Sequence, residues 1–309
     1  KKGYPRYLVP KHYVDAVGDE EYGRHPVGSG PYKLIMHKPG EIMRFEAVDW
    51  DHWRGNPHWK FVELITVPEA STRAAMLIQG EADIATVPIA KLDEVEAAGN
   101  RIISVPNAII SRLVGWGFDQ CTSDDMLPFC DVRVRQALSL AINRQEIIDV
   151  ILDGHGEPNN PPVVVKGSDE VTQERWAAWK EENLRYDLPE AKRLMAEAGY
   201  PNGFKHKMYK ARGMAGDDWM PAVIDAVAVY WQDLGIQTEI IEGQWQALRK
   251  EFGRNTGVSG EALGAWGTTA GSIPIRGFLN ASGYFSSKGK VVYLTSTPEM
   301  DELFELGLY

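Results

Sequence analysis

The stretch of residues 128–154, PFCDVRVRQALSLAINRQEIIDVILDG, constrains the fold more than any other part of the chain. Asp131 is suited to cap a helix, because its carboxylate can accept a hydrogen bond from a free backbone N–H of the first turn. The apolar residues that follow recur at three- and four-residue steps, which predicts one buried helix face formed by Val134, Ala137, Leu138, Ala141 and Ile142. A second short helix is predicted over residues 144–152, and Gly154 can end it in a left-handed conformation. The stretch therefore predicts a buried helix pair in an α/β domain.

Composition places the chain among ordinary globular proteins. Its 309 residues are enough for two domains, and 44% of them are hydrophobic and 25% charged. The 33 basic and 43 acidic residues give a net charge of -10. This balance argues against nucleic acid or an anionic membrane surface as the main partner.

Before the helix pair, the sequence predicts a hairpin and a mixed unit. Residues 32–48 read as two strands around a turn at Pro39-Gly40. The segment 61–87 is predicted to form a strand–helix–strand unit, with its second strand at 83–87 and Ser71 as the helix cap.

After the helix pair, a capping box at Asp187 and Glu190 predicts a helix that Gly199 ends. The elements predicted next are a strand at 205–210, a helix capped by Asp217 and a strand at 236–240. A strand, a helix and a strand in succession predict a parallel α/β layer. The apolar face predicted for that helix consists of Val223, Ala226, Val227, Tyr230 and Leu234. The glycine-rich residues 253–271 are predicted to form a loop that is interrupted by an apolar patch at 263–266.

Three stretches carry a resemblance to a known family. Residues 128–154 resemble the segment that opens the second lobe of the family 5 extracytoplasmic solute-binding proteins, the peptide- and nickel-type substrate-binding subunits of ABC transporters. Residues 25–33 (HPVGSGPYK) and 186–204 (YDLPEAKRLMAEAGYPNGF) are similar to further family segments, in the same order. The resemblance runs along nearly the whole chain and is weakest after about Gly253.

This resemblance implies an α/β fold of the periplasmic-binding-protein type, in which two lobes are joined by a hinge. Residues 1–118 correspond to part of lobe I and residues 119–309 to lobe II, with the hinge expected within 116–124. Family members begin with an export signal and a long N-terminal segment, which this chain is not expected to contain, and it is expected to stop early. The resemblance therefore implies a fragment with lobe I incomplete, from a periplasmic or other extracytoplasmic protein that is either lipid-anchored or free.

Cys121 and Cys130, the chain's two cysteines, are separated by eight residues. In the oxidising compartment that the resemblance implies, a disulfide between them would stabilise the fold by roughly 2–3 kcal/mol. The alternative is two free thiols near the junction of the lobes.

No catalytic, metal or cofactor site follows from the sequence. His52 and His58 lie in the aromatic segment 50–59 without an accompanying cluster of acidic or sulfur ligands, which favours an exposed loop over a metal site. The Gly28-Ser-Gly turn lacks the Lys-Ser/Thr of a phosphate-binding loop, and no GxSxG nucleophile elbow is present. A binding protein is therefore expected, with an enzyme such as a hydrolase as the alternative from another class.

Peptide-binding members of the family carry a Trp-x-x-Asp motif in lobe II, whose carboxylate holds the ligand's ammonium group. Trp266 matches the Trp, Gly267 follows it, and Thr269 stands in the place of the Asp. Ile273 occupies the position of a second Asp that is usual in the family. A hydroxyl can hydrogen-bond an amine but supplies no opposite charge in a desolvated cleft, so this departure lowers the expectation of a ligand with a free amine.

Arg254, Arg276 and Trp245 are further candidates for the ligand site. Arg254 and Arg276 can pair with a carboxylate through two parallel hydrogen bonds, although a solvated surface charge is the favoured reading for each. Trp245 and Trp266 can stack on a sugar or on an apolar side chain, or belong to the core.

The expected function is capture of a small ligand between the two lobes and its delivery to an ABC transporter permease. A peptide is the ligand class that the family implies first. An oligosaccharide is the alternative, because the lost charge at Thr269 and the ten tryptophans suit a neutral glycan. A sensor or chaperone-like role on the same fold is a third reading, since fold does not fix function.

Overall fold

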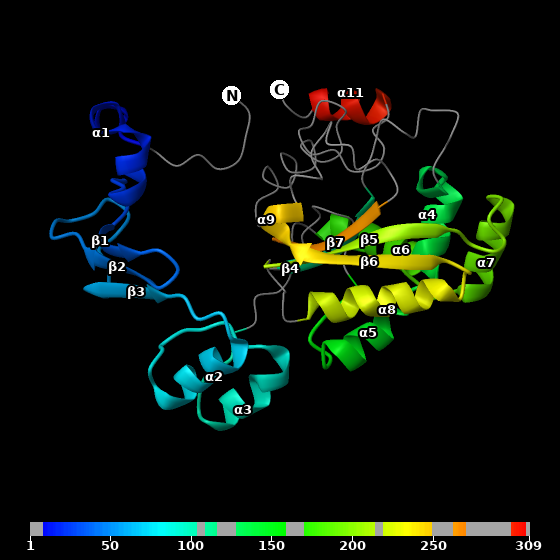
Figure 1. The fold of residues 1–309 in the computed structure, drawn as a ribbon, viewed down its shortest axis with the longest axis horizontal. Helices are drawn as coiled ribbons and strands as arrows, with labels where there is room; N and C mark the ends of the chain where they lie inside the picture. Colours follow the sequence, from blue (N-terminus) through cyan, green and yellow to red (C-terminus); the bar gives the residue numbers. More distant parts are fainter. Residues whose placement is uncertain are drawn as a thin grey trace. The chain divides into compact units, whose positions relative to one another are not determined.

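The computed structural model describes residues 9–103, 109–115, 128–158, 170–213, 219–248, 262–269 and 298–306. The chain divides into two compact units, drawn in Figure 1. Unit 1 consists of Lys1–Val87 with Ala97–Asn100, and unit 2 consists of Pro88–Glu96 with Arg101–Tyr309. The hinge predicted within 116–124 and the lobe boundary predicted at 118 lie outside the described residues and stay predictions.

Unit 1 contains a small antiparallel sheet. Its elements are α1 (Lys11–Arg24), β1 (Tyr32–Lys38), β2 (Ile42–Ala47), β3 (Phe61–Ile65) and α2 (Ala70–Gln79). The strands pair in the order β1-β2-β3. The predicted hairpin is confirmed as β1 and β2, and Gly40 supplies the positive φ of 76° in its turn. The register brings Leu34, Phe45 and Val62 side by side on one face of the sheet.

The strand–helix–strand unit predicted in this part of the chain is wrong in its last member. β3 pairs antiparallel with β2, and residues 83–87 form no strand in the part of the chain that is described. Ile84, whose apolar side chain favoured a strand there, is 92% exposed and packs on no sheet. Ser71 is not the cap of α2 either, because the helix begins after Glu69, whose side chain makes no capping bond. Gly80 ends α2 in the left-handed conformation, with a φ of 72°.

Unit 2 is built on a four-stranded sheet. The short helices η1 (Ile89–Lys91) and most of α3 (Leu92–Ala97) belong to it. The other elements are β4 (Ile109–Gly115), η3 (Pro128–Cys130), α4 (Val132–Leu140), α5 (Arg144–Ile151), α6 (Glu170–Asn183), α7 (Leu188–Glu197), β5 (Lys205–Arg212), α8 (Met220–Gln232), β6 (Gln237–Gln244), α9 (Trp245–Leu248), β7 (Ala262–Thr269) and α11 (Pro298–Leu306).

The sheet of unit 2 has the strand order β4-β7-β5-β6. β5 runs parallel to both β6 and β7, whereas β4 is antiparallel to β7. The predicted parallel layer of β5, α8 and β6 is therefore confirmed, and α8 packs along the sheet with α5 against it (Figure 1). The loop predicted over 253–271 is wrong for residues 262–269, which form β7.

The organising helix pair forms as predicted. Asp131 caps α4 by accepting a hydrogen bond from the backbone N–H of Arg133 at 2.8 Å, and all five predicted face residues of this stretch are buried. Gly154, at φ 76°, follows α5. The guanidinium of Arg144, at the start of α5, is partly buried and donates to the carbonyl and hydroxyl of Ser139 on α4, each at 2.9 Å. Burial lowers the pKa of Arg144 to about 10.

The core of unit 2 lies between α8, the sheet and the α4–α7 pair. Trp231 of α8 is its largest fully buried side chain, and the indole Nε1–H donates to the carbonyl of Leu138 at 3.0 Å. α8 buries Met220, Ile224, Val227, Ala228 and Trp231. Of the face predicted for this helix, Val227 and Leu234 are buried, and Val223, Ala226 and Tyr230 are partly buried against the core. The prediction is therefore confirmed for these residues but missed the more deeply buried Ile224 and Trp231.

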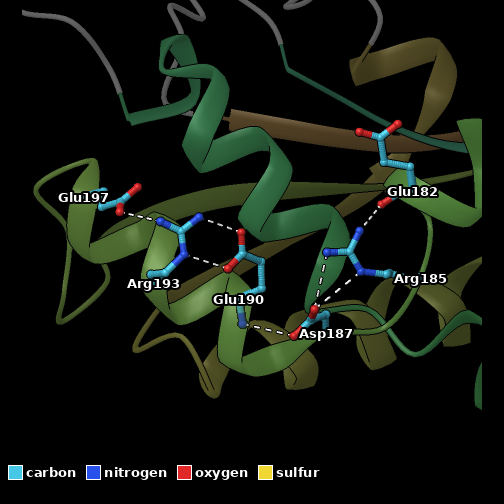
Figure 2. A network of polar contacts seen from close by, with 6 residues as sticks. All are labelled: Glu182, Arg185, Asp187, Glu190, Arg193 and Glu197. Atoms are coloured by element: carbon cyan, nitrogen blue, oxygen red, sulfur yellow. Dashed lines mark hydrogen bonds and ion pairs between the residues drawn. The ribbon is translucent and has the colours of Figure 1, made fainter.

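The capping box predicted for α7 is correct in one of its two hydrogen bonds. Asp187 accepts from the backbone N–H of Glu190 at 3.1 Å, but the N–H of Asp187 donates to the carbonyl of Leu140 at 2.9 Å. The carboxylate of Glu190 turns instead to Arg193, which also bonds Glu197 (Figure 2). Its hydrogen bond with Arg193 lowers the pKa of Glu190. The network is exposed, where ion pairs contribute little to stability.

Cys130, at the end of η3, is disulfide-bonded. Its predicted partner Cys121 lies outside the described residues. Arg135 donates to the carbonyls of Phe129 and Cys130 at 2.9 and 2.8 Å, so these charge-assisted bonds fix the turn that leads into α4. Within the described ranges, none of the helices combines the length and the hydropathy required to cross a bilayer.

Candidate functional site

The carboxyl ends of three parallel strands of unit 2 lie at one edge of the sheet. Arg212, at the end of β5, pairs with Gln244 at the end of β6. The pairing of β5 with β7, continued two residues beyond Lys210 and Ala265, brings Gly267 level with Arg212. Ligands of open α/β sheets bind outside the carboxyl ends of the strands. We take this "carboxyl edge", defined as residues 212–213, 244–245 and 267–269, as the candidate site.

Several residues predicted from the sequence lie at the carboxyl edge. Trp245 is the first residue of α9, directly after β6, and its side chain is half-buried. Gly267 and Thr269 are among the last three residues of β7, and Trp266 directly precedes Gly267. β7, which ends at Thr269, and β6, which Trp245 directly follows, are two strand spacings apart, or about 10 Å. The register of β4 and β7 pairs Trp266 with Arg112.

The two predicted arginines are not among these residues, since Arg254 and Arg276 lie outside the described part of the chain. The sequence reasoning missed Arg212, Gly213 and Gln244. It ended the two strands at 210 and 240, whereas β5 runs to Arg212 and β6 to Gln244. The signal that could have found these residues is the rule that the residues just after parallel strands share one edge.

Gly213 and Gln244 touch across the carboxyl edge. Gly213 has a positive φ of 77°, and a Cβ at this position would lie 2.7 Å from Oε1 of Gln244. The side chain of Gln244 therefore lies against a stretch of bare backbone, and any side chain at position 213 would displace it.

Charges at the carboxyl end of β5 are balanced. The Nε of Arg212 lies 3.2 Å from Oε1 of Glu242, and the Nζ of Lys210 lies 3.0 Å from Asp225 and 3.2 Å from Glu242. Desolvation lowers the pKa of Lys210, but its hydrogen bonds to the two carboxylates outweigh this effect and the net pKa is raised. Two cations facing two carboxylates add no net charge to this end of the strand.

The carboxyl edge carries several groups that can recognise a ligand. It presents an amide, an indole, a guanidinium and the backbone of a strand end, all of which serve noncovalent recognition. Among the described residues, no group of three or more His, Cys, Asp or Glu side chains is arranged to hold a metal ion.

Comparison with known proteins places this geometry in context. The family model for bacterial extracellular solute-binding proteins, family 5 (middle), matches residues 4–283. The chain is 25% identical over 236 residues to heme-binding protein A of Haemophilus influenzae, covering 75% of this chain and 40% of that protein. It is 29% identical over 194 residues to glutathione-binding protein GsiB of Pectobacterium atrosepticum, covering 62% of this chain and 35% of that protein. The chain thus spans less than half the length of these curated relatives.

Among solved structures, the oligopeptide-binding protein AppA of Bacillus subtilis in complex with a nonapeptide superposes with a TM-score of 0.66 at 23% identity. The match covers 96% of this chain and 59% of that one. This likeness confirms the predicted α/β fold of the periplasmic-binding-protein type.

Proposed function

The chain belongs to family 5 of the bacterial extracellular solute-binding proteins, and from this premise we propose that it binds a small ligand outside the cytoplasm for an ABC transporter permease. The ligand class we propose is a peptide. The role is binding without turnover, and the carboxyl edge of unit 2 contributes contacts to the ligand.

The observation that carries this proposal is the family match over residues 4–283 of the 309. Two named similarities support the ligand class, since one relative is a glutathione-binding protein and one similar structure holds a nonapeptide. At the carboxyl edge, the backbone at the end of β7 and the amide of Gln244 supply hydrogen-bonding groups that an extended peptide backbone can use. The hydroxyl of Thr269 can accept from a ligand amine without adding a charge.

The test is thermal unfolding of the purified protein with a panel of peptides, glutathione, heme, oligosaccharides and nickel complexes. A ligand bound only by the native state stabilises it by about 2.7 kcal/mol at a hundredfold excess over Kd. We expect the unfolding temperature to rise with peptides. A rise with glycans alone would replace the peptide by an oligosaccharide, and chemical conversion of any of these compounds would contradict the binding role.

Replacing Trp245 by alanine is expected to weaken peptide binding about tenfold, equivalent to about 1.4 kcal/mol, because the half-buried indole beside the end of β6 would no longer pack on the ligand. Isothermal titration measures Kd for the variant and the parent protein. Trp53→Ala is the matched control, since Trp53 belongs to unit 1 and is 80% exposed. Equal loss of affinity in both variants would remove Trp245 from the site.

A further inference from the structure

One polar side chain is enclosed in the core of unit 2. Among the described residues, His206 of β5 is the polar residue that is buried in the core, with 5% of its surface exposed. The imidazole is surrounded by aromatic rings, with centroid distances of 5.6 Å to Phe129, 6.2 Å to Phe204 and 5.6 Å to Trp231. These rings come from η3, from the turn before β5 and from α8, so the imidazole lies where three parts of the unit meet.

The hydrogen bonds of His206 fit its neutral form. The Nδ1 lies 3.1 Å from the carbonyl oxygen of Lys207, and the Nε2 lies 2.8 Å from the hydroxyl of Thr238 on β6. A carbonyl oxygen can only accept, so Nδ1 carries the proton and Nε2 accepts from the hydroxyl. A second proton on Nε2 would force the hydroxyl of Thr238 to give up its donor role and to find another acceptor.

Protonation would also place a cation in an apolar enclosure. The charged side chains on the elements packed around the imidazole, and directly beside those elements, are Lys205, Lys207, Lys210 and Arg212 on β5, Glu239 and Glu242 on β6, Asp225 on α8 and Asp233 after it, and Asp131 and Arg135 beside η3. Glu242 and Asp225 pair with Lys210, and Glu242 also pairs with Arg212. Glu239 and Asp233 are exposed, and Asp131 pairs with Arg133. Neither polar partner of the imidazole is a carboxylate. A buried charge without a counter-ion is costly, and the loss falls on the folded state.

Burial lowers the pKa of His206 from its ordinary 6.5, and the hydrogen bond to the Lys207 carbonyl offsets part of this effect. The stabilisation that depends on the neutral ring is fully present above pH 6.5, which is the pKa of this histidine in the unfolded chain. It is lost as the pH falls from 6.5 toward the lower value of the folded state.

We propose that His206 is an acid-sensitive element of unit 2, whose protonation loosens the packing of η3 and α8 on the sheet. The geometry that supports this is the aromatic enclosure, the fixed tautomer and the absence of a paired carboxylate among the described neighbours. The inference goes beyond the proposed function, because it concerns how the medium changes the stability of the fold and does not depend on which ligand is bound.

The test compares thermal unfolding of the parent protein, His206→Gln and His206→Phe at pH 7.5 and pH 5.5. Both variants remove the titratable group while filling the space with a neutral side chain. We expect the parent protein to lose at least about 3 °C more than either variant between the two pH values. His155→Gln is the matched control, since His155 is exposed in the same unit, and it should keep the pH response of the parent protein.

A second measurement covers the case in which a variant does not fold. Following the imidazole of His206 by NMR in the parent protein, we expect the ring to remain neutral until the core signals of Trp231 and Phe129 begin to change. A ring that titrates with no change in those signals would overturn the proposal. Equal pH responses of the parent protein and the folded His206 variants would overturn it as well.

Discussion

Gly203→Ala is expected to destabilise unit 2 by about 3–5 kcal/mol, because an added methyl group meets backbone that cannot move aside. The built Cβ would overlap the carbonyl group of Gly235 and lie 2.7 Å from the backbone nitrogen of Ile236. Gly203 also has a φ of 71°, a conformation that residues with a Cβ resist. The two turns approach so closely because β5 and β6 begin beside one another, with Lys205 paired to Gln237.

Urea unfolding of the purified variant measures this loss. Gly199→Ala is the matched control, since Gly199 has a φ of 90° but nothing lies within 4 Å of its built Cβ. Gly199→Ala should lose only the free energy needed to place a residue with a Cβ at positive φ, roughly 1 kcal/mol. Similar losses in both variants would mean that the turn after α7 can shift away from Gly235, and the contact between the turns would not be a constraint on the sheet.

Trp231→Ala is expected to cost about 3–5 kcal/mol, the range for removing a large aromatic side chain from a packed core. Trp231 is 1% exposed and lies among residues of α4, α7 and the sheet. The substitution also leaves the carbonyl of Leu138 without its indole donor.

Trp231→Phe separates the two contributions, because it keeps most of the apolar surface and removes only the donor. We expect it to cost about 1–3 kcal/mol in the same urea experiment. Trp53→Ala, at a position that is 80% exposed, should change stability by less than about 0.5 kcal/mol. A loss for Trp231→Ala no larger than that of this control would contradict the position of Trp231 in the core.

Local chemistry made part of the fold predictable. Asp131 caps α4 and Gly40 turns the first hairpin because each acts on residues next to it in the chain. The family predicted from three stretches is confirmed by the match over residues 4–283. The sequence alone did not show which of several locally equivalent structures, such as alternative buried faces of one helix, tertiary packing would select.

Helix α8 illustrates such a choice. Nearly every residue from 220 to 231 is apolar, so the spacing fits more than one buried face. Val223 and Tyr230 of the predicted face are partly buried against the core, but Ile224 and Trp231, which the prediction omitted, are buried more deeply. The strand predicted at 83–87 failed for a related reason, because a strand exists only where another strand pairs with it, and pairing depends on residues far away in the sequence.

The candidate site was predictable in composition but not in arrangement. Trp245, Gly267 and Thr269 were named from the sequence, yet residues 262–269 were read as a loop because glycine disfavours strands. Pairing with β4 on one side and β5 on the other overrides that preference. Strand order then decides that Trp245 and Thr269 belong to the same edge of the sheet, and strand order is a property of the whole unit.

The hydrogen bond from the N–H of Asp187 to the carbonyl of Leu140 joins the start of α7 to the end of α4. Two further bonds hold the end of α6, shortly before α7, to the helix pair: the hydroxyl of Ser139 donates to the carbonyl of Asn183, and Arg144 of α5 donates to the carbonyl of Leu184. The first turn of α7 therefore cannot fray without breaking contacts to another helix. The two helices should open as one cooperative unit, and the amide of Asp187 should exchange its hydrogen with solvent only when α4 also comes apart.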